Sequence, residues 1–545
     1  MSSFGASPIP NPVNEPVRAY APGSPERARL EKELDRQLAA QVDVPLIIGG
    51  EEIRTGTIEA MVMPHDHGHV TGHCHQAGEA EVAKALAAAE AARPGWAALP
   101  WEDRAAVFLR AARLLEDEFR DRINAATMLG QSKTCHQAEI DAACELIDFF
   151  RFNVHFLERI YAEQPISPNT GEWNRVEYRP LDGFVFAISP FNFTSIAANL
   201  CAAPVMCGNT VVWKPAPTAM LSGHVIMELF AAAGLPPGVI NFVPGSPAAV
   251  GGQVMADPRL AGIHFTGSTA TFKLLWQQAS ANLDRYHSYP RIVGETGGKD
   301  FVFAHPSADL DRLAVALLRG AFEYQGQKCS AASRAYVPAS LWPQLRQRLA
   351  DNLPLIKMGD VRDFSNFMGA VIDARAFAKH AGAIAEAKAA VGGDIDEVIG
   401  GEVDDSVGYF VRPTIIVSKR PDYRTMVEEL FGPILTIYVY PDDAFEQTLK
   451  LCDQCTPYAL TGGVFAEDRQ ALATAAAALR FAAGNFYIND KPTGAVVGQQ
   501  PFGGSRASGT NDKAGSMWNL IRWLSPRTIK ENLAPPKDWR YPFLG

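Results

Sequence analysis

The chain has 545 residues, of which 47% are hydrophobic and 20% charged, and its formal net charge is −10. This length exceeds one compact core, so two or three domains are expected. The acidic balance argues against a nucleic-acid partner, and the lack of a basic stretch or of an apolar run of about 18 residues argues against a membrane partner or span.

The N-terminal segment and the cysteines predict the compartment. The segment lacks the apolar stretch of a secretory signal, and its early acidic residues and prolines are atypical of a transit peptide. The 8 cysteines are sparse and irregularly spaced, which indicates reduced thiols rather than a disulfide framework. We therefore expect a cytoplasmic protein.

The first half of the chain is predicted to be an α/β unit. Residues 1–50 read as an extended arm with a short helix, and the helices expected here are 25–41, 79–93, 101–115 and 137–163. Further along, helices near 195–206 and 220–230 alternate with apolar, β-rich runs at 184–189, 210–214, 239–244 and 262–268. Such alternation predicts a parallel sheet with helices on both faces and a ligand site beyond the carboxyl ends of its strands.

A second α/β block is predicted to begin near residue 294. Its strands are expected at 301–305, 334–338, 414–418, 434–440 and 463–467. Helices separate some of them, at 309–323, 340–353, 443–452 and 468–481. No internal repeat or low-complexity linker is present, so the boundary is a change of unit and not a flexible tether.

Two motifs at predicted strand ends suit a dinucleotide. In "FTGS", Gly267 permits a tight turn and Ser268 caps a helix whose free N–H groups would bind a pyrophosphate; an ordinary capped helix is the alternative. In "VVWKP", Lys214 would reach a ribose or phosphate, or else be a solvated strand end. The usual G-x-G-x-x-G fingerprint is absent here, so a standard Rossmann motif is not indicated.

Three further residues suit acyl chemistry. Cys329 lies among polar and small residues in "QGQKCSAA", where a substrate would reach its thiol, whereas a cysteine in an apolar stretch is usually inert. Glu295 precedes a glycine pair and would act as a general base for water, or be a surface residue of a turn. Asn192 in "PFNFTS" would donate to an oxyanion, or belong to a packed loop.

Two other cysteine- and histidine-containing stretches favour structural roles. The tract "HDHGHVTGHCH" at 65–75 lacks regular ligand spacing, so a solvent-facing hairpin is favoured over a metal site. Cys452 and Cys455 form C-x-x-C without a second pair and are interpreted as core and surface thiols. No metal site is predicted.

The motifs "PFN", "WKP", "FTGS", "ETGGK", "GQKC", "EELFGP" and "PFGG", in this order from Pro190 to Gly504, resemble the NAD(P)-dependent aldehyde dehydrogenase superfamily. Each motif is weak alone, but seven in order are very specific. The resemblance implies an α/β aldehyde dehydrogenase fold in three parts. These are a Rossmann-like NAD-binding domain at 1–161 and 187–293, an α/β catalytic domain at 294–503, and a small β oligomerisation flap with a tail at 162–186 and 504–545.

The resemblance also implies roles for the acyl-chemistry residues and for the cofactor NAD. Cys329 is the nucleophile, Glu295 the general base, and Asn192 with the N–H of Cys329 the oxyanion hole. The implied cofactor contacts are Ser189, Pro190, Phe191, Lys214 at the adenosine ribose, Gly267, Ser268 at the pyrophosphate, Glu429 at the nicotinamide ribose, and Phe431 near the nicotinamide. Many members carry an acidic residue where this chain has Pro217, which leaves the choice between NAD and NADP open.

A narrower set of stretches, including "GEWNRVEYRPLDGF", "TGAVVGQQPFGG" and "ASGTNDKAG", resembles the L-glutamate γ-semialdehyde dehydrogenases. These enzymes oxidise the open form of Δ1-pyrroline-5-carboxylate to L-glutamate in proline catabolism. The resemblance implies that Gly494 and Ala495 bind the substrate carboxylate. The other implied substrate contacts are Ser330 beside the carboxylate, Phe193 and Phe502 around the aliphatic part, Glu145 near the amino group, and Lys328.

Three alternatives remain open: another semialdehyde dehydrogenase, an acylating enzyme that uses coenzyme A, and a non-catalytic protein that reuses the fold. The segments 171–180 and 525–536 read as strands that pair with another subunit, because they would otherwise leave unpaired edges. We therefore expect a homodimer or a higher homo-oligomer. A transient contact with proline dehydrogenase is a further expectation from the resemblance.

Overall fold

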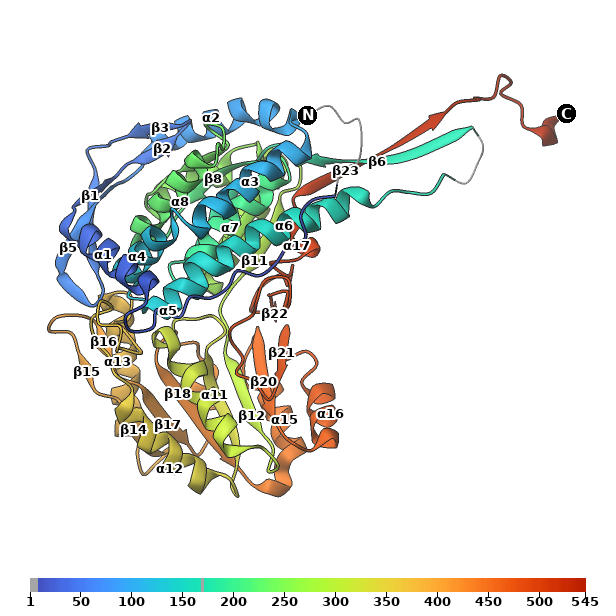
Figure 1. The fold of residues 1–545 in the computed structure, drawn as a ribbon. Coiled ribbons are helices and arrows are strands. Elements are labelled where there is room, and N and C mark those ends of the chain that lie inside the picture. The colour runs from blue at the N-terminus through green and yellow to red at the C-terminus, as the bar shows by residue number, and fades with distance from the viewer. Residues whose placement is uncertain (1–7, 168–170) are drawn as a thin grey trace.

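The computed structural model describes residues 8–167 and 171–545, which form two α/β lobes and a long projecting ribbon (Figure 1). The first lobe is built on a seven-stranded sheet. Its strands, in spatial order, are β11 (Arg291–Glu295), β10 (Leu260–Thr266), β7 (Phe184–Ile188), β8 (Thr210–Lys214), β9 (Ile240–Phe242), β2 (Leu46–Ile48) and β3 (Glu51–Ile53). The strands from β11 to β9 are parallel, whereas β2 pairs antiparallel with both neighbours.

Helices cover both faces of this sheet, as the alternation of strands and helices predicts. Successive residues of β7 point to opposite faces: Val185 and Ala187 pack in one core, and Phe184 and Phe186 in another. The first core is formed with α3 (Trp101–Glu116), α4 (Arg120–Gln131), α6 (Glu145–Ala162), α7 (Thr194–Met206) and α8 (Met220–Ala232). The second is formed with α2 (Glu79–Ala98), α9 (Gly252–Ala256) and α10 (Thr269–Ala281).

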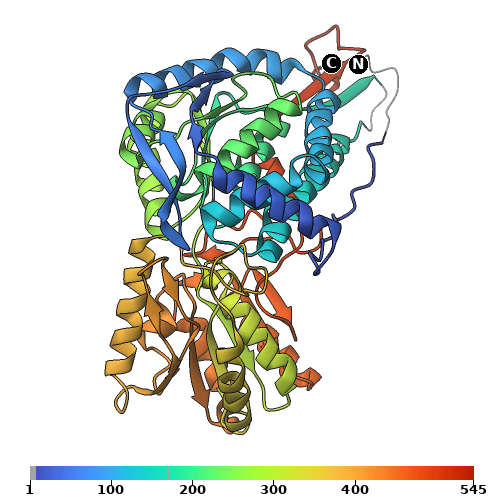
Figure 2. The same ribbon diagram turned by 60° about the vertical axis from the view of Figure 1, so that its left-hand side comes forward.

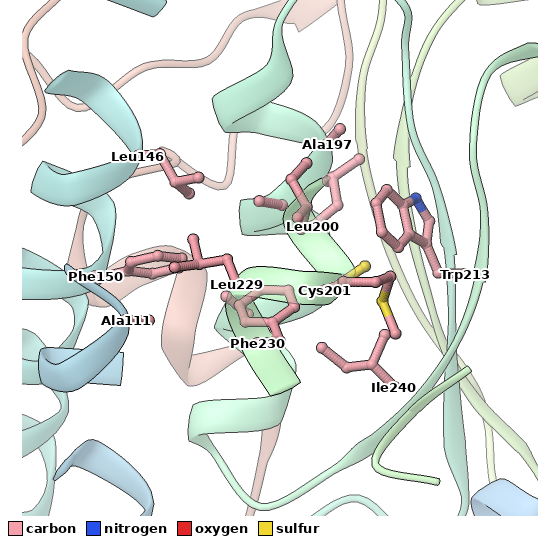
Figure 3. Packing of buried hydrophobic residues seen from close by; sticks show 14 of the residues in the cluster. Ala111, Leu146, Phe150, Ala197, Leu200, Cys201, Trp213, Leu229, Phe230 and Ile240 are labelled. Atoms are coloured by element: carbon pink, nitrogen blue, oxygen red, sulfur yellow. The ribbon is translucent and has the colours of Figure 1, made fainter. Parts of the chain in front are cut away.

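Figure 3 shows the first of these cores, where Phe150 of α6, Phe230 of α8 and Trp213 of β8 converge. Phe108 completes an aromatic group with Phe150 and Phe230, whose ring centroids are 5.8–6.1 Å apart. Cys201 lies inside this packing and is fully buried, so it behaves as a small apolar residue. This core fixes α6 and α7 against the sheet, and both helices carry residues of the candidate site.

The second lobe contains another seven-stranded sheet, mostly parallel. Its strands, in order, are β14 (Ile395–Gly400), β17 (Thr414–Ser418), β18 (Ile434–Tyr440), β13 (Ala332–Pro338), β12 (Asp300–Ala304), β20 (Thr461–Phe465) and β21 (Asn485–Ile488), and only β14 is antiparallel. One face packs on α11 (Leu310–Phe322) and α12 (Trp342–Asn352), the other on α15 (Phe445–Gln454) and α16 (Arg469–Ala478). The outer strands also pack on α13 (Ala374–Ala389).

The chain crosses from the first sheet to the second between Glu295, at the end of β11, and Asp300, at the start of β12. This crossing lies at the residue 294 boundary of the sequence analysis and contains the glycine pair. The segment that follows the second sheet returns to this crossing: β22 (Ser505–Arg506) pairs with β19 (Tyr458–Ala459), and Gly509 forms a bridge with Glu295. The candidate base therefore sits where three segments of the chain meet.

The projecting ribbon consists of β6 (Glu172–Pro180) and β23 (Leu524–Asn532), which pair antiparallel along their whole length. The strands are thus each other's partners, whereas the sequence analysis paired each with another subunit. The tail region from residue 504 is also not all ribbon: α17 (Met517–Ile521) and the fully buried Trp523 pack against the first lobe. Figure 2 shows the ribbon and both ends of the described chain on the same side of the molecule.

The histidine tract forms β5 (Asp66–His75), which pairs with β1 (Val42–Val44) and β4 (Ile58–Met63). The β4–β5 pair is a hairpin, but it is not solvent-facing throughout, because His65 and His75 are buried. His75 explains this: its ring contacts the Thr55 carbonyl oxygen at 2.7 Å and the Asp43 carboxylate at 2.9 Å. Among the described residues, no group of three or more histidine, cysteine or acidic side chains is placed to hold a metal ion.

None of the helices in the described ranges has both the length and the apolar character that a membrane crossing requires.

Candidate active site

Two cavities meet at Cys329, at the junction of the lobes. One has a volume of about 630 Å³ and the other about 280 Å³. Among their lining residues, only Cys329 and Ile196 belong to both. The eight residues predicted to contact a cofactor all line the larger cavity, and the seven predicted to contact a substrate all line the smaller one.

The larger cavity lies at the carboxyl ends of the strands of the first sheet, where parallel α/β sheets bind ligands. Ser189 and Pro190 follow β7, Lys214 ends β8, and Gly267 follows β10. Ser268 is the N-cap of α10, because its hydroxyl accepts a hydrogen bond of 3.2 Å from the N–H of Thr271. The free N–H groups of this helix start would face an anionic group bound in the cavity.

Lys214 is buried, not solvated as a strand end would be, and burial lowers its pKa to about 8. At the other end of the cavity, the rings of Phe191 and Phe431 lie 5.8 Å apart in an edge-to-face arrangement. The cavity thus presents a helix start, a lysine and an aromatic pair along one path that ends at Cys329. The Oγ1 atom of Thr266 lines this path, is buried, and has no hydrogen-bond partner among the described residues. These features fit an extended dinucleotide, with its phosphates at α10 and its ring near Phe431.

Two glycines bring Glu429 and Cys329 close together. A Cβ atom at Gly297 would lie 2.1 Å from the Glu429 carboxylate, and one at Gly298 would lie 2.2 Å from the carbonyl oxygen of Cys329. The N–H of Gly298 donates a hydrogen bond of 2.8 Å to Glu429. No other residue type fits these two positions without displacing the site, which gives the "ETGGK" motif its physical basis.

The loop at residues 325–330, called the cysteine loop below, is held by two buried glutamines that were not predicted as site residues. Gln325 donates to the carbonyl oxygens of Ser132 and Ala370 and accepts from the N–H of Gly369. Gln327 accepts from the N–H of Ile372 at 2.9 Å. These bonds hold a left-handed backbone turn, with φ of 54° at Gln325, directly before the cysteine.

The carbonyl oxygen of Gln327 also accepts a hydrogen bond of 3.0 Å from the side-chain amide of Asn192. An amide has two N–H donors, so Asn192 keeps one for another acceptor while this bond fixes its orientation. Asn192 is 4% exposed and lines the larger cavity beside Cys329. A pre-oriented, buried donor of this kind suits the role predicted for Asn192, which is to donate to an oxyanion.

The Cys329 thiol is partly exposed to the two cavities but is enclosed by protein on its other sides. Burial raises its pKa well above the usual value, and the negative charges of Glu295, Asp300 and Glu429 raise it further. The resting side chain is therefore a thiol, and its proton must leave before or during attack on a substrate.

Glu295, the predicted general base, has a carboxyl whose surroundings favour its protonated form. Burial raises the pKa of its carboxyl to about 8, while Lys513 opposes the shift. Its Oε1 atom is buried and has no hydrogen-bond partner within the described ranges. Behind it lies a third cavity of about 20 Å³, which Asp512 and Lys513 also line and which has room for one water molecule.

The smaller cavity is lined by acidic side chains and by a segment without helix or strand. Glu145 and Asp141 are the acidic residues, and Gly494 and Ala495 belong to the segment. The rings of Phe193 and Phe502 also line this cavity, with Ser330 and Lys328 beside the sulfur. This arrangement offers a carboxylate, N–H donors and apolar walls, which suits a short amino acid chain.

A buried proton network around these acidic residues was missed by the sequence analysis. The Ser195 hydroxyl lies 2.7 Å from the Glu145 carboxyl and 3.0 Å from the Asp141 carboxyl, but it has one proton to donate. A proton on Glu145 supplies the donor for the second hydrogen bond. Burial and the nearby negative charge of Asp141 favour this protonated form, and they raise the pKa of Glu145 to about 8. Lys133, fully buried beneath Phe193, pairs with Asp141. No periodicity marks such long-range contacts.

The profile of the aldehyde dehydrogenase family matches residues 53–529. The chain belongs to the aldehyde dehydrogenase family.

Two curated relatives of this aldehyde dehydrogenase are named mitochondrial delta-1-pyrroline-5-carboxylate dehydrogenases. The protein from Dictyostelium discoideum is 52% identical over 100% of this chain and 98% of its own length. The human protein is 50% identical over 98% of this chain and 94% of its own length. A crystal structure of the delta-pyrroline-5-carboxylate dehydrogenase from Mycobacterium tuberculosis bound with NAD is 56% identical, with a TM-score of 0.96, and covers 99% of this chain and 100% of that chain.

The names of these relatives correct one prediction. The Dictyostelium and human proteins are named as mitochondrial, so the cytoplasmic location predicted from the N-terminal composition is wrong. The prediction was based on the lack of an apolar stretch and on the acidic and proline content, whereas transit peptides are defined by amphipathic, Arg- and Ser-rich character.

The pKa of Glu295 predicts how this aldehyde dehydrogenase responds to pH. A carboxyl with a pKa near 8 is mostly protonated at pH 6 and ionised at pH 9. If it is the general base, the steady-state rate should rise about tenfold per pH unit below the pKa and level off above it. Turnover measured from pH 6 to 9 tests this, and a rate that is flat over this range would contradict the assignment.

Proposed function

We propose that this protein oxidises L-glutamate γ-semialdehyde, the open form of Δ1-pyrroline-5-carboxylate, to L-glutamate with NAD⁺. The observation that supports this most strongly is the meeting of the two cavities at one sulfur, Cys329, with an oxyanion donor and a base beside it. The smaller cavity also matches this substrate, because it provides N–H donors for a carboxylate, Glu145 for an amino group, and aromatic walls between them.

The larger cavity fits NAD⁺, which supplies the acceptor for the hydride of the substrate. Lys214 and the N-terminus of α10 would hold its adenosine half, Ser268 by capping the helix under the pyrophosphate. Glu429, fixed by the N–H of Gly298, would hold the nicotinamide ribose. Pro217 also lines this cavity and offers no charged partner for a ribose hydroxyl, so strict preference for NAD over NADP is a prediction and not a consequence of the fold.

Catalysis then proceeds on residues of the protein in three steps. Cys329 loses its proton and its sulfur bonds to the aldehyde carbon, while the free N–H of Asn192 and the backbone N–H of Cys329 stabilise the oxyanion. Departure of the hydride from that carbon leaves a thioester on Cys329. Glu295 then removes a proton from a water molecule that attacks the thioester, and L-glutamate leaves as the sulfur is released.

The alternatives differ in what they require of this site. An enzyme for a semialdehyde without an amino group has no need of Glu145, and acylation of coenzyme A has no need of a base that activates water. Glu145 lines the smaller cavity beside Ser195 and Asp141, and an acidic side chain in this position favours an amino acid substrate. A non-catalytic role would not require an accessible sulfur at the junction of two cavities.

The proposal is tested by an absorbance assay for NADH formation with Δ1-pyrroline-5-carboxylate, which opens to the semialdehyde in water. We expect a kcat/KM at least about 100-fold higher than with succinate semialdehyde, because a site built to bind a polar group rejects substrates that lack it. Equal rates with both aldehydes would refute the substrate assignment, and no NADH with either would refute the activity. A parallel assay with NADP⁺ measures the cofactor preference.

The ribbon supports a further proposal about assembly. The two strands β6 and β23 project from the body and carry the exposed Trp173 and the half-buried Val176 and Ile529. A two-stranded ribbon is marginally stable alone, so we infer that it packs against a second copy in a homodimer or larger homo-oligomer. A transient contact with proline dehydrogenase, whose product would be the substrate here, is also proposed. Sedimentation of the protein alone and with that enzyme tests both.

A further inference from the structure

The N-terminal arm, residues 8–24, is an extended segment without a helix or strand, and it runs beside α6 toward the junction of the lobes (Figure 1). Three of its residues, Asn14, Glu15 and Val17, line the smaller cavity. Most of the other residues in this lining come from α6, the cysteine loop and the 491–502 segment. The arm is therefore part of the wall of the proposed substrate site, although it lies more than 300 residues from Cys329 in sequence.

Asn14 joins two walls of this cavity. Its side-chain amide donates hydrogen bonds to the Asp148 carboxylate of α6, at 2.8 Å, and to the carbonyl oxygen of Val497, at 2.9 Å. Its amide oxygen accepts a third hydrogen bond, of 2.9 Å, from the Gln499 side chain. One side chain thus uses both amide donors and its acceptor to link α6 to the 491–502 segment.

The neighbouring residue fixes the arm itself. The backbone N–H of Glu15 donates to Asp148 at 2.7 Å, and its carboxylate pairs with Arg120 at 2.5 Å and with Arg151 at 3.0 Å. Arg120 is fully buried and also pairs with Glu139. These contacts hold this part of the arm against α6. The position of Asn14 relative to α6 is therefore fixed, and its hydrogen bonds fix the 491–502 segment relative to α6 as well.

The segment that Asn14 contacts is anchored near both ends, by the 2.8 Å hydrogen bond between the hydroxyls of Ser330 and Thr493 and by the backbone hydrogen bonds between Phe502 and Ala514, and Asn14 contacts it between these two points. It lies between the last strand of the second sheet, β21, and the short strand β22, and no strand or helix spans 489–504. Gly494 has a left-handed φ of 97°, and Gly494 and Ala495 line the cavity two to three residues before Val497. The position of their N–H groups therefore depends on side-chain contacts to the segment, of which Asn14 supplies two.

We propose that Asn14 is a positioning residue that determines substrate specificity. It holds the 491–502 segment in the position where the backbone N–H groups of Gly494 and Ala495 bind the α-carboxylate of the substrate. The inference rests on the proposed function, because it concerns how that substrate is recognised. Asn14 acts through this segment and not on the reacting atoms. Its loss should therefore weaken binding of an aldehyde that carries an α-carboxylate and leave the chemistry at Cys329 intact.

The experiment compares Asn14→Ala with the unaltered protein on two aldehydes, L-glutamate γ-semialdehyde and butanal, which has no carboxylate. We expect KM for the semialdehyde to rise about tenfold, since hydrogen bonds from one side chain to the segment are lost, with kcat changed less than about twofold. KM for butanal should stay unchanged. Asn11→Ala is the matched control, because Asn11 is exposed on the same arm and makes no side-chain hydrogen bond within the described residues.

A second variant approaches the contact from the segment. Gln499→Ala removes an exposed side chain, so it should not disturb folding, and it should raise KM for the semialdehyde about threefold. The double variant should be less affected than the sum of the two single effects, because both changes break the same link. Equal loss with both aldehydes, or unchanged KM for the semialdehyde in either variant, would overturn the inference. Failure of the unaltered protein to oxidise the semialdehyde would instead refute the proposed function.

Discussion

Cys329→Ala is expected to abolish aldehyde oxidation while leaving cofactor binding intact. The change removes the only sulfur that both cavities reach, and loss of a covalent nucleophile typically costs at least about 10⁴-fold in kcat. The larger cavity keeps Lys214, Ser268 and Glu429, so the dissociation constant for NAD⁺, measured by calorimetry, should change little. NADH formation and calorimetry on the same preparation test both parts.

The control for this variant is Cys135→Ala. Cys135 is another partly exposed cysteine, but it lines neither cavity, so its loss should leave turnover unchanged. Normal turnover of Cys329→Ala would show that another group attacks the aldehyde. Loss of NAD⁺ binding together with activity would show instead that the change has disturbed the junction of the lobes.

Glu295→Gln is expected to separate the two halves of the reaction. Glutamine has the same shape but does not accept a proton, so formation of the thioester should continue while its hydrolysis slows by about 10²–10⁴-fold. Rapid mixing should therefore show a burst of NADH approaching one equivalent per Cys329, followed by a slow steady state. The rise of rate with pH through about 8 should disappear in this variant.

Glu446→Gln provides the matched control, because Glu446 is exposed on α15, far from either cavity lining. It should retain the normal rate without a burst. If Glu295→Gln instead slowed the burst and the steady state equally, Glu295 would serve in deprotonating Cys329 rather than in activating water.

Local sequence patterns predicted the two parallel sheets well. Strands such as 210–214 and 414–418 coincide with β8 and β17, because buried parallel strands read as unbroken apolar runs. The patterns failed at the edge strands β3 and β14, which are partly polar, and at β2, an interior strand of three residues that is too short to give a signal; residues 1–50 were read as an arm and a helix alone. At an edge, half of each strand faces solvent and the apolar signal is lost.

The motif residues of the candidate site could be predicted from the sequence, and the residues that support them could not. The motif residues lie at strand ends or glycine turns, where local sequence carries a signal, and they come together in the fold. The supporting residues carry none: Gln325, Gln327, Lys133 and Asn14 are polar side chains whose partners lie far away in the chain. Their function depends on being buried together, which one sequence does not reveal.

The two cavities reach the molecular surface at different residues, the larger beside Leu274 and the smaller beside Val17, and they share Cys329 and Ile196 inside the molecule. A small molecule that carries a carbonyl electrophile with an amino acid tail would occupy one side, and the sulfur would bond to its carbonyl carbon while the thiol proton moves to the carbonyl oxygen. A second fragment, tethered to it, would extend into the dinucleotide side. Many dehydrogenases have a dinucleotide cavity, so the selectivity of such a two-armed inhibitor would come from its amino acid arm. Either arm alone would leave the entrance of the other cavity open.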